Sequence, residues 1–280
     1  MKTAMNRFFL LLTAGLAACG LSSCLDVVPL DVPKAAPVLA VDGQITDQGT
    51  PAAVTLALTQ PYFNDAPPPP VTGATLTLED DQGQRDELRE ERPGYYRGRG
   101  AVLGRIGGRY TLTIVADGQT YRAETEIRRT PEVDSVSLEF KPKQTGFDEG
   151  YYALYNGPEL VGVGDYYRFK VYKNGVLFNE PSDLIVSSDE LVDGRYISGL
   201  ELNGDPLVKG DTLRVELQSI PRDYYYFLNE MTTQINNVGL FATSPANVRT
   251  NVRNTQAGSS KTAVGYFAGY TVRTDSVVVK

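Results

Sequence analysis

The chain has 280 residues with 27 Lys and Arg against 34 Asp and Glu, a formal net charge of −7, no His, no Trp and two Cys. The absence of His excludes imidazole-based catalytic relays and His-ligated metals or haem, and the acidic balance argues against a nucleic-acid partner, whose phosphates need a basic surface. With 41% apolar and 22% charged residues, the chain is predicted to be globular and long enough for one large or two small domains.

Residues 1–23 are predicted to be a lipoprotein signal peptide. Lys2 and Arg7 precede an apolar stretch that runs to about Ala18, which is too short to span a bilayer. Small residues then precede Cys19 and again Cys24, as in the bacterial lipobox, where the Cys is acylated and becomes the new N-terminus. We favour Cys24 as the lipid anchor, carrying palmitate-type chains, with Cys19 as the alternative, because the chain turns polar and strand-like soon after Cys24. A further alternative is release of a soluble protein by an ordinary signal peptidase.

Residues 24–37 contain three prolines and little periodicity, so they are predicted to be an extended tether. From residue 38 onward, apolar and polar positions alternate, and this period predicts a β-sandwich of six or seven strands over residues 38–130. The clearest hairpin joins residues 110–114 to residues 121–127 across Asp117 and Gly118, a dipeptide suited to a tight turn with positive φ angles.

A short linker at residues 130–132 is predicted to separate this sandwich from a second, β-rich domain over residues 133–280, because Pro131 cannot continue a central strand. The alternation at residues 167–172 and 213–218 predicts half-buried antiparallel strands. A polar surface loop over residues 244–261 and a last strand at residues 264–272 are also assigned to this domain.

The second domain is predicted to contain the one helix of the fold, at about residues 220–237. Ser219 is a possible N-cap, and Pro221 lies in the first turn. Apolar side chains follow at helical spacing, at positions 224, 227, 228, 231 and 235, and they form one stripe that we expect to pack on the second sheet. The predicted fold class is therefore all-β and mainly antiparallel, with two β-sandwich-like domains and one packed α-helix.

Two acidic runs are the candidate sites for cation or acid–base chemistry. The run Asp189-Glu190-Leu191-Val192-Asp193-Gly194 could offer oxygens to Ca²⁺, but it lacks the pattern of an EF-hand loop, so a solvated turn is favoured. The run Glu79-Asp80-Asp81 precedes Gln82-Gly83 and is predicted to form a hairpin turn, since adjacent carboxylates on a strand point to opposite faces. No catalytic, metal-ligating or cofactor-binding residue is predicted, and the chain is not expected to be an enzyme.

Clusters of tyrosine are the candidate binding residues for a glycan or a peptide, because Tyr combines a flat apolar ring with a polar edge. In each cluster some rings are expected in the core and the others on the surface. The clusters are Tyr151-Tyr152, Tyr166-Tyr167 and Tyr224-Tyr225-Tyr226. The glycine-rich segment 104–108 has no Lys-Ser/Thr and no predicted helix after it, so it is not a phosphate-binding loop.

The order of several short motifs resembles the Bacteroidota lipoprotein family known as domain of unknown function 4249. The motifs are Leu39 to Asp47, Pro61-Tyr62-Phe63, Val71 to Ala74, Tyr166 to Phe169, Ser188 to Gly194, Gly210-Asp211-Thr212, Val215 to Ile220, Tyr224 to Asn229, Pro245 to Asn251 and Gly265-Tyr266-Phe267. The first region also resembles carboxypeptidase-regulatory or transthyretin-like sandwiches, through Gly73-Ala74 and Gly94-Tyr95-Tyr96.

The resemblance implies an outer-membrane lipoprotein, commonly encoded beside a TonB-dependent transporter and without an established activity. It leaves the membrane face open between periplasm and cell surface, because only Asp26 follows Cys24 closely. The function expected is that of an accessory or ligand-capturing partner of such a transporter. The alternative is an independent surface adhesin or a glycan- or peptide-binding module.

Overall fold

The structure is a computed structural model that describes residues 36–61, 64, 66–144, 148–202, 204–237, 244 and 246–280. The predicted signal peptide, both cysteines and nearly all of the tether lie outside the described residues. Residues 37–280 form one unit by their mutual contacts. Within the described ranges, no helix is both long and apolar enough to cross a membrane.

The described elements are almost all strands. Their bounds are β1 Leu39–Thr46, β2 Ala53–Leu58, β3 Thr75–Asp80, β4 Arg85–Arg92, β5 Tyr95–Arg97, β6 Arg109–Ala116, β7 Gln119–Glu126, β8 Ser135–Lys141, β9 Gly150–Pro158, β10 Tyr166–Lys173, β11 Val176–Leu177, the 3-10 helix η2 Pro181–Asp183, β12 Ile185–Ser188, β13 Tyr196–Glu201, β14 Thr212–Ser219, helix α2 Arg222–Ile235, β15 Arg253–Asn254, β16 Ala263–Tyr270 and β17 Arg273–Val278. The all-β prediction with one α-helix is confirmed.

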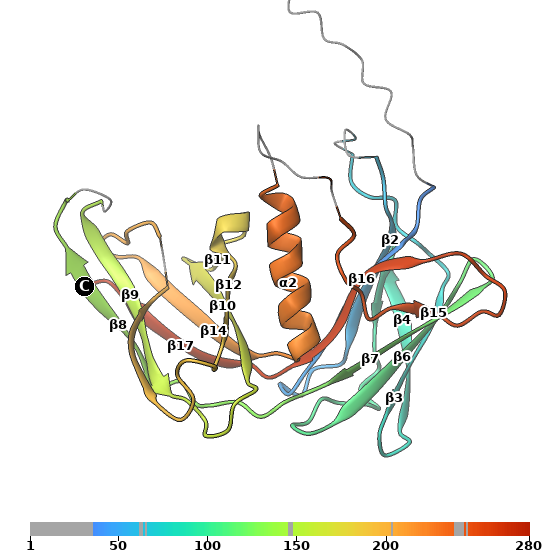
Figure 1. Ribbon diagram of the computed structural model, residues 1–280, viewed down its shortest axis with the longest axis horizontal. Coiled ribbons are helices and arrows are strands. Elements are labelled where there is room, and N and C mark those ends of the chain that lie inside the picture. The colour runs from blue at the N-terminus through green and yellow to red at the C-terminus, as the bar shows by residue number, and fades with distance from the viewer. Residues whose placement is uncertain are drawn as a thin grey trace, which may run out of the picture. The chain divides into compact units, whose positions relative to one another are not determined.

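The N-terminal sandwich is built on a nine-stranded sheet with the order β15-β7-β6-β3-β4-β5-β2-β1-β16 (Figure 1). Its inward residues alternate along each strand and include Leu76, Leu112 and Ile114, which are at most 1% exposed. The predicted hairpin is confirmed: Ala116 pairs with Gln119 across Asp117 and Gly118, whose φ angles are 48° and 66°. Residues 38–130 contain the seven strands β1 to β7, where six or seven were predicted.

Two strands from the end of the chain return to this sandwich, which corrects the domain that we predicted for them. β15 pairs with β7, and β16 lies parallel to β1 along its whole length. Parallel pairing needs a long connection and buries both strand faces, so local periodicity does not reveal it. Gly265 permits the close approach, because a Cβ at that position would lie 2.0 Å from the carbonyl oxygen of Val41. β15 also lies inside the segment predicted as a loop.

The second sandwich is formed by the sheet β11-β10-β14-β17, with β12 paired to β10, and the sheet β13-β9-β8. Its core contains Phe169, Val171, Leu213, Val215 and Leu217, which are the inward positions expected from the alternation. β16 and β17 follow each other directly in the chain, so the C-terminal segment contributes a strand to each sandwich. The predicted boundary at residues 130–132 therefore does not divide the chain into two separate domains. The residues before it all belong to the first sandwich, but the residues after it contribute to both sandwiches.

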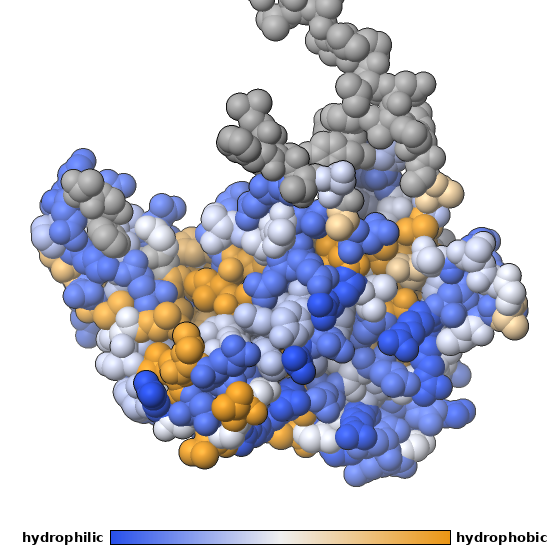
Figure 2. All heavy atoms as spheres, viewed as in Figure 1, coloured by the Kyte–Doolittle hydropathy of each residue, from blue (hydrophilic) through white to orange (hydrophobic). Residues whose placement is uncertain are grey.

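Helix α2 is shorter than predicted and begins differently. Its N-cap is Pro221, with no side-chain cap, because Ser219 is the last residue of β14 and donates its hydroxyl to the carbonyl of Arg129 at 2.6 Å. Leu228 is the buried residue of the helix, and Ile235 at its end is 46% exposed. The helix contacts β10 and β12, and its aromatic residues also pack on Tyr266 of β16. Hydrophobic surface is visible beside the helix (Figure 2).

Candidate functional site

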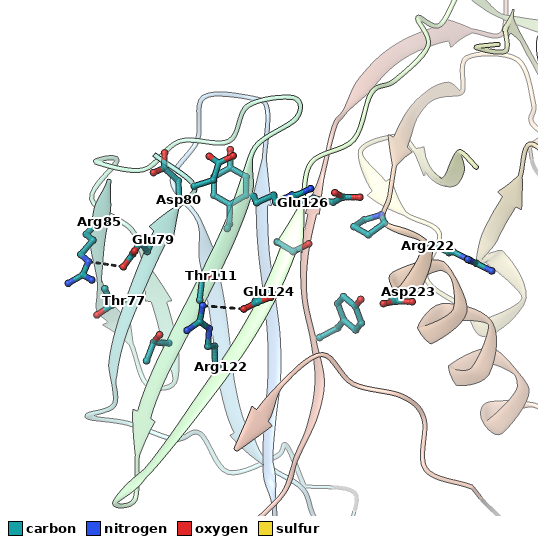
Figure 3. Close-up of a pocket in the computed structure, with 17 residues that line it drawn as sticks. Thr77, Glu79, Asp80, Arg85, Thr111, Arg122, Glu124, Glu126, Arg222 and Asp223 are labelled. Carbon is teal, nitrogen blue, oxygen red and sulfur yellow. Dashed lines mark hydrogen bonds and ion pairs between the residues drawn. The ribbon is translucent and has the colours of Figure 1, made fainter. Parts of the chain in front are cut away.

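A groove of about 870 Å³ lies between the outer face of β3, β6 and β7 and the start of helix α2 (Figure 3). We call it the charged groove. Its lining comprises Thr77, Glu79, Asp80, Asp81, Arg85, Arg109, Tyr110, Thr111, Thr113, Arg122, Glu124, Thr125, Glu126, Pro221, Arg222, Asp223 and Tyr266. Most of these side chains are charged or carry a hydroxyl.

The floor of the charged groove follows from the period-two pattern of the strands. Alternate residues of β6 point inward to the core, so Arg109, Thr111 and Thr113 share the outer face. The strand register places Thr113 opposite Arg122 and Thr111 opposite Glu124 on β7. The result is an ordered array of hydroxyl, carboxylate and guanidinium groups on three neighbouring strands.

Exposed ion pairs hold part of this array. Arg85 Nε donates to Glu79 at 2.7 Å, with side chains 71% and 42% exposed, and Arg122 lies 3.1 Å from Glu124. Among the described residues, Arg109 has no ion pair and Thr111 and Thr113 have no side-chain hydrogen bond. These three groups are available to a ligand that carries carboxylate, hydroxyl or amide groups.

The acidic run at residues 79–81 forms the turn that was predicted, and it also borders the charged groove. Asp80 Oδ1 accepts the backbone N–H groups of Gln82 and Gln84 at 2.9 and 2.8 Å. Glu79 pairs with Arg85, and Asp81 pairs with Arg105. The three carboxylates are thus used separately and do not converge as an acid–base pair.

A second cluster of charges lies where the two sandwiches join. The Arg129 guanidinium, which follows β7, donates to Asp165 Oδ2 from Nε at 2.9 Å and from Nη2 at 2.6 Å. It also donates to the carbonyl oxygens of Val161 and Gly162 at 3.0 and 2.6 Å. Asp165 is fully buried. We call this arrangement the Arg129 clamp, because it fixes the loop at residues 159–165.

The Arg129 clamp includes the acidic residues that could hold a metal ion. Glu159, Asp165 and Asp189 are all buried, and each offers an oxygen within 4.8 Å of the others. Asp189 already accepts the N–H groups of Gly164 and Asp165, and Glu159 accepts the hydroxyl of Tyr167 at 2.5 Å. Burial raises the pKa of Glu159. The guanidinium of Arg129 supplies the positive charge here, so the geometry supports an ion-pair network.

The predicted turn at residues 189–194 contributes Asp189 and Asp193 to this region. Asp193 Oδ1 accepts the N–H of Gly162 at 2.6 Å, and Gly194 N donates to the carbonyl of Leu160. Glu190 is exposed. The carboxylates hold two neighbouring loops together, at residues 159–165 and 189–195.

The two clamped loops present large aliphatic side chains to solvent. Val161 is 79% exposed, Val163 is 66% exposed and Leu191 is 86% exposed. We call these residues the apolar loop tips. Exposed aliphatic side chains on loops that are already held in place can be buried against another protein with little loss of conformational entropy.

The tyrosine clusters predicted as binding residues lie mainly in packed regions. Tyr152, Tyr166 and Tyr167 are at most 6% exposed, and Tyr151 packs edge-on against Phe140 with ring centroids 5.2 Å apart. The cluster at residues 224–226 packs against Tyr166 and Tyr266. The segment 104–108 is a loop before β6, and Tyr110 Oη accepts the N–H of Arg105 at 2.8 Å.

Sequence reasoning missed the Arg129 clamp and the apolar loop tips. Arg129 stands beside the predicted linker, and nothing local distinguishes it from Arg128. Its carboxylate partner lies 36 positions away in the sequence. The one available signal is the Val-Gly-Val-Gly sequence at residues 161–164, whose aliphatic residues stand in a glycine-rich loop.

The family model described as "Domain of unknown function (DUF4249)" matches residues 26–276. The search of curated proteins found no match. A solved structure titled "Cytokine receptor complex - Crystal form 1A" aligns with 85% of this chain and 96% of that chain, at 11% identity and a TM-score of 0.25. That score is too low to support an argument about fold or function.

Proposed function

We propose, from the premise that this chain belongs to the DUF4249 family, that it is an outer-membrane lipoprotein acting as an accessory, ligand-capturing partner of a TonB-dependent transporter. Cys24 is its lipid anchor in this proposal, with Cys19 as the alternative. The Bacteroidota origin and the transthyretin-like character of the first sandwich belong to the same proposal. Tethering to the membrane raises the effective concentration of the two proteins, so tight binding is not required.

The observation that carries this proposal is the set of apolar loop tips. Three aliphatic side chains that are between 66% and 86% exposed stand on loops fixed by hydrogen bonds from backbone N–H groups to the carboxylates of Asp189 and Asp193. Burying such side chains against another protein contributes about 25 cal/mol per Å² of apolar area. Because the loops are already held in place, little conformational entropy is lost on docking. A transporter is the occupant that we assign to this surface.

The charged groove is the ligand-binding part of the proposal. It lies on the outer face of the first sandwich, whereas the apolar loop tips belong to the second. Arg109, Thr111 and Thr113 offer unused donors and acceptors beside exposed ion pairs. A polar ligand with both hydrogen-bond donors and acceptors, such as a peptide or an oligosaccharide, matches this lining.

Co-purification tests the partnership. The tagged protein is purified from detergent-solubilised outer membranes of its native host, and the associated proteins are identified by mass spectrometry. A TonB-dependent transporter is expected in near-stoichiometric amount. The triple variant Val161→Ser, Val163→Ser, Leu191→Ser is expected to lose it while keeping the circular dichroism spectrum of the wild type.

The matched control places the same substitution at exposed aliphatic residues elsewhere, Val176→Ser and Val208→Ser, which are 70% and 61% exposed. These variants are expected to retain the transporter. Recovery of the lipoprotein alone, under conditions that preserve other outer-membrane complexes, would favour an independent adhesin or binding module. Cys24→Ala tests the anchor: the variant is expected to leave the detergent phase, and retention there would point to Cys19.

A further inference from the structure

A second, smaller pocket lies between helix α2, β10 and the segment from β11 to η2. Its volume is about 200 Å³. Its lining comprises Arg168, Phe169, Lys170, Leu177, Phe178, Asn179, Glu180, Pro181, Asp183, Leu184, Met231, Thr232 and Ile235. It shares no lining residue with the charged groove. We call it the helix pocket.

Two cations lie side by side on one wall of the helix pocket. Arg168 and Lys170 are two positions apart on β10, so they project from the same face of the sheet, opposite to the buried Phe169. Both residues are only partly exposed. No ion pair in the described part of the chain involves either of them. The buried Nε of Arg168 has no hydrogen-bond partner, and Arg168 Nη1 lies 3.5 Å from the hydroxyl of Tyr224.

Of the acids near this wall, Glu216, Asp183 and Glu180 are engaged elsewhere, whereas Asp42 of β1 is exposed and forms no ion pair within the described residues. Glu216 faces Lys170 across the strand pair, but it binds Arg214 and accepts from Gln218 at 3.3 Å. Asp183 Oδ2 accepts the N–H of Glu180, and the Glu180 side chain accepts in return, so both acids cap η2. Burial, followed by the repulsion of Arg168, lowers the pKa of Lys170. Glu216 and Asp42 oppose this shift, but neither is within ion-pair distance of Arg168 or Lys170 in the described part of the chain.

The opposite wall of the helix pocket is apolar. Met231 and Ile235 come from one face of α2, and Leu177, Phe178 and Leu184 come from the β11 to η2 segment. Ile235 remains 46% exposed. Hydrophobic surface is visible beside helix α2, on the side of β11 and β12 (Figure 2). One side of the pocket thus offers two cationic hydrogen-bond donors, and the other side offers apolar contact.

We propose that the helix pocket binds a small organic carboxylate with an apolar group, the carboxylate lying between Arg168 and Lys170 and the apolar group against Met231 and Ile235. Arginine and lysine make charge-assisted hydrogen bonds to a carboxylate, which are about twice as strong as neutral ones. A volume of about 200 Å³ suits a molecule of the size of benzoate. The apolar wall offers no partner for further anionic oxygens, which disfavours a dianion such as phosphate.

Fluorine NMR titration tests this proposal with the full chain in an uncharged detergent. The probes are para-fluorobenzoate, its neutral analogue para-fluorobenzamide, and inorganic phosphate as a competitor. Saturable binding of the benzoate is expected, with the benzamide weaker by about tenfold or more. Lys170→Gln is expected to weaken benzoate binding by about tenfold or more. Lys209→Gln is the matched control, because Lys209 is exposed and lies outside the pocket, and it is expected to bind as the wild type does.

Ile235→Glu keeps the test decisive if Lys170→Gln lowers the folded fraction, since residue 235 is 46% exposed and lies at the end of the helix. This variant places a carboxylate at the apolar wall and is expected to abolish benzoate binding. Equal affinity for benzoate and benzamide, or unchanged binding in Lys170→Gln, would overturn the proposal. So would the absence of saturable benzoate binding up to about 10 mM. Displacement by phosphate as effective as by unlabelled benzoate would overturn the assigned ligand class.

Discussion

The charged groove and the Arg129 clamp contain the same residue types in opposite environments. In the groove, Arg85 and Glu79 pair at 2.7 Å with side chains 71% and 42% exposed. In the clamp, Arg129 pairs with Asp165 at 2.6 Å, and the Asp165 side chain is 0% exposed. The difference teaches that equal geometry does not mean an equal contribution to stability. The groove pairs can exchange partners with a ligand, whereas the clamp fixes the loops that present the apolar loop tips.

The physical reason is solvation. Water screens exposed pairs, and their net contribution is small, about 0 to 1 kcal/mol. A buried carboxylate depends on the partners that replace its water, so removal of one partner leaves the full desolvation penalty. Four substitutions, taken from the largest expected effect to the smallest, test this contrast.

Arg129→Ala is expected to have the largest effect. It leaves the buried Asp165 without both of its guanidinium hydrogen bonds. Because the Arg129 side chain is 45% exposed and Arg128 Nη2 stays 3.8 Å from Asp165 Oδ1, the expected loss in the free energy of unfolding is about 3 kcal/mol, at the low end for a buried pair. Urea unfolding followed by circular dichroism measures it. Arg89→Ala, at an exposed arginine, is the control and is expected to change stability by less than about 0.5 kcal/mol. A loss below about 1 kcal/mol for Arg129→Ala would mean that water replaces the guanidinium, and the contrast would fail.

Asp86→Ala extends the contrast to a buried carboxylate that binds backbone groups. Asp86 is 3% exposed and accepts the N–H groups of Arg99, Gly100 and Ala101 at 2.8 to 3.1 Å. The substitution is expected to destabilise the fold by about 2 to 3 kcal/mol. The neighbouring Glu87→Ala, at an exposed position of the same strand, serves as the control and is expected to be nearly neutral. Similar losses for both variants would show that burial is not the cause.

Asp211→Asn is expected to change the pH dependence of stability. The N–H of Val208, the amide of Asn174 and the ammonium of Lys173 lower the pKa of Asp211 from 3.8 to about 2. Because the folded pKa is below the unfolded one, the carboxylate stabilises the fold by about 2 kcal/mol above pH 4, and this is lost as pH falls towards 2. Unfolding curves between pH 2 and pH 7 measure the difference between variant and wild type. The difference should shrink at low pH; a constant difference, or the same behaviour in the exposed control Glu139→Gln, would count against this assignment.

Arg85→Ala is expected to have the smallest effect on stability. Its exposed ion pair with Glu79 is expected to contribute at most about 0.5 kcal/mol to the free energy of unfolding, and less at high salt. Urea unfolding at low and high ionic strength measures both quantities. A loss above about 1.5 kcal/mol in the free energy of unfolding would mean that this exposed pair stabilises the fold as the Arg129 clamp does. The distinction between the two regions would then fail.

The local elements of the fold were predictable because they depend on neighbours in the sequence. The hairpin across Asp117 and Gly118 and the inward residues of β10 and β14 follow from period-two alternation and turn chemistry. The helix was predicted within two residues at each end. The predicted N-cap residue was wrong, because Ser219 completes β14 and donates its hydroxyl to the carbonyl of Arg129.

The candidate sites were predictable only in part. The acidic turn at residues 79–81 proved to border the charged groove, and Asp189 proved to belong to the Arg129 clamp. Arg129, Arg168 and Lys170 carried no local signal, because each acquires its role from strands or loops distant in the sequence. The sequence did not show which tyrosines of each cluster are buried, because the same residues can pack in a core or lie on a surface.

The sequence by itself determined the strand and turn periodicity, the one helix, the acidic balance and the exclusion of histidine chemistry, because composition and short-range spacing fix these properties. Only the tertiary structure decided that β16 pairs in parallel with β1, that Arg129 neutralises a buried carboxylate, and that Arg168 and Lys170 face an apolar wall. These features depend on which distant segments meet and on how much water remains between them, and neither is encoded in the spacing of neighbouring residues.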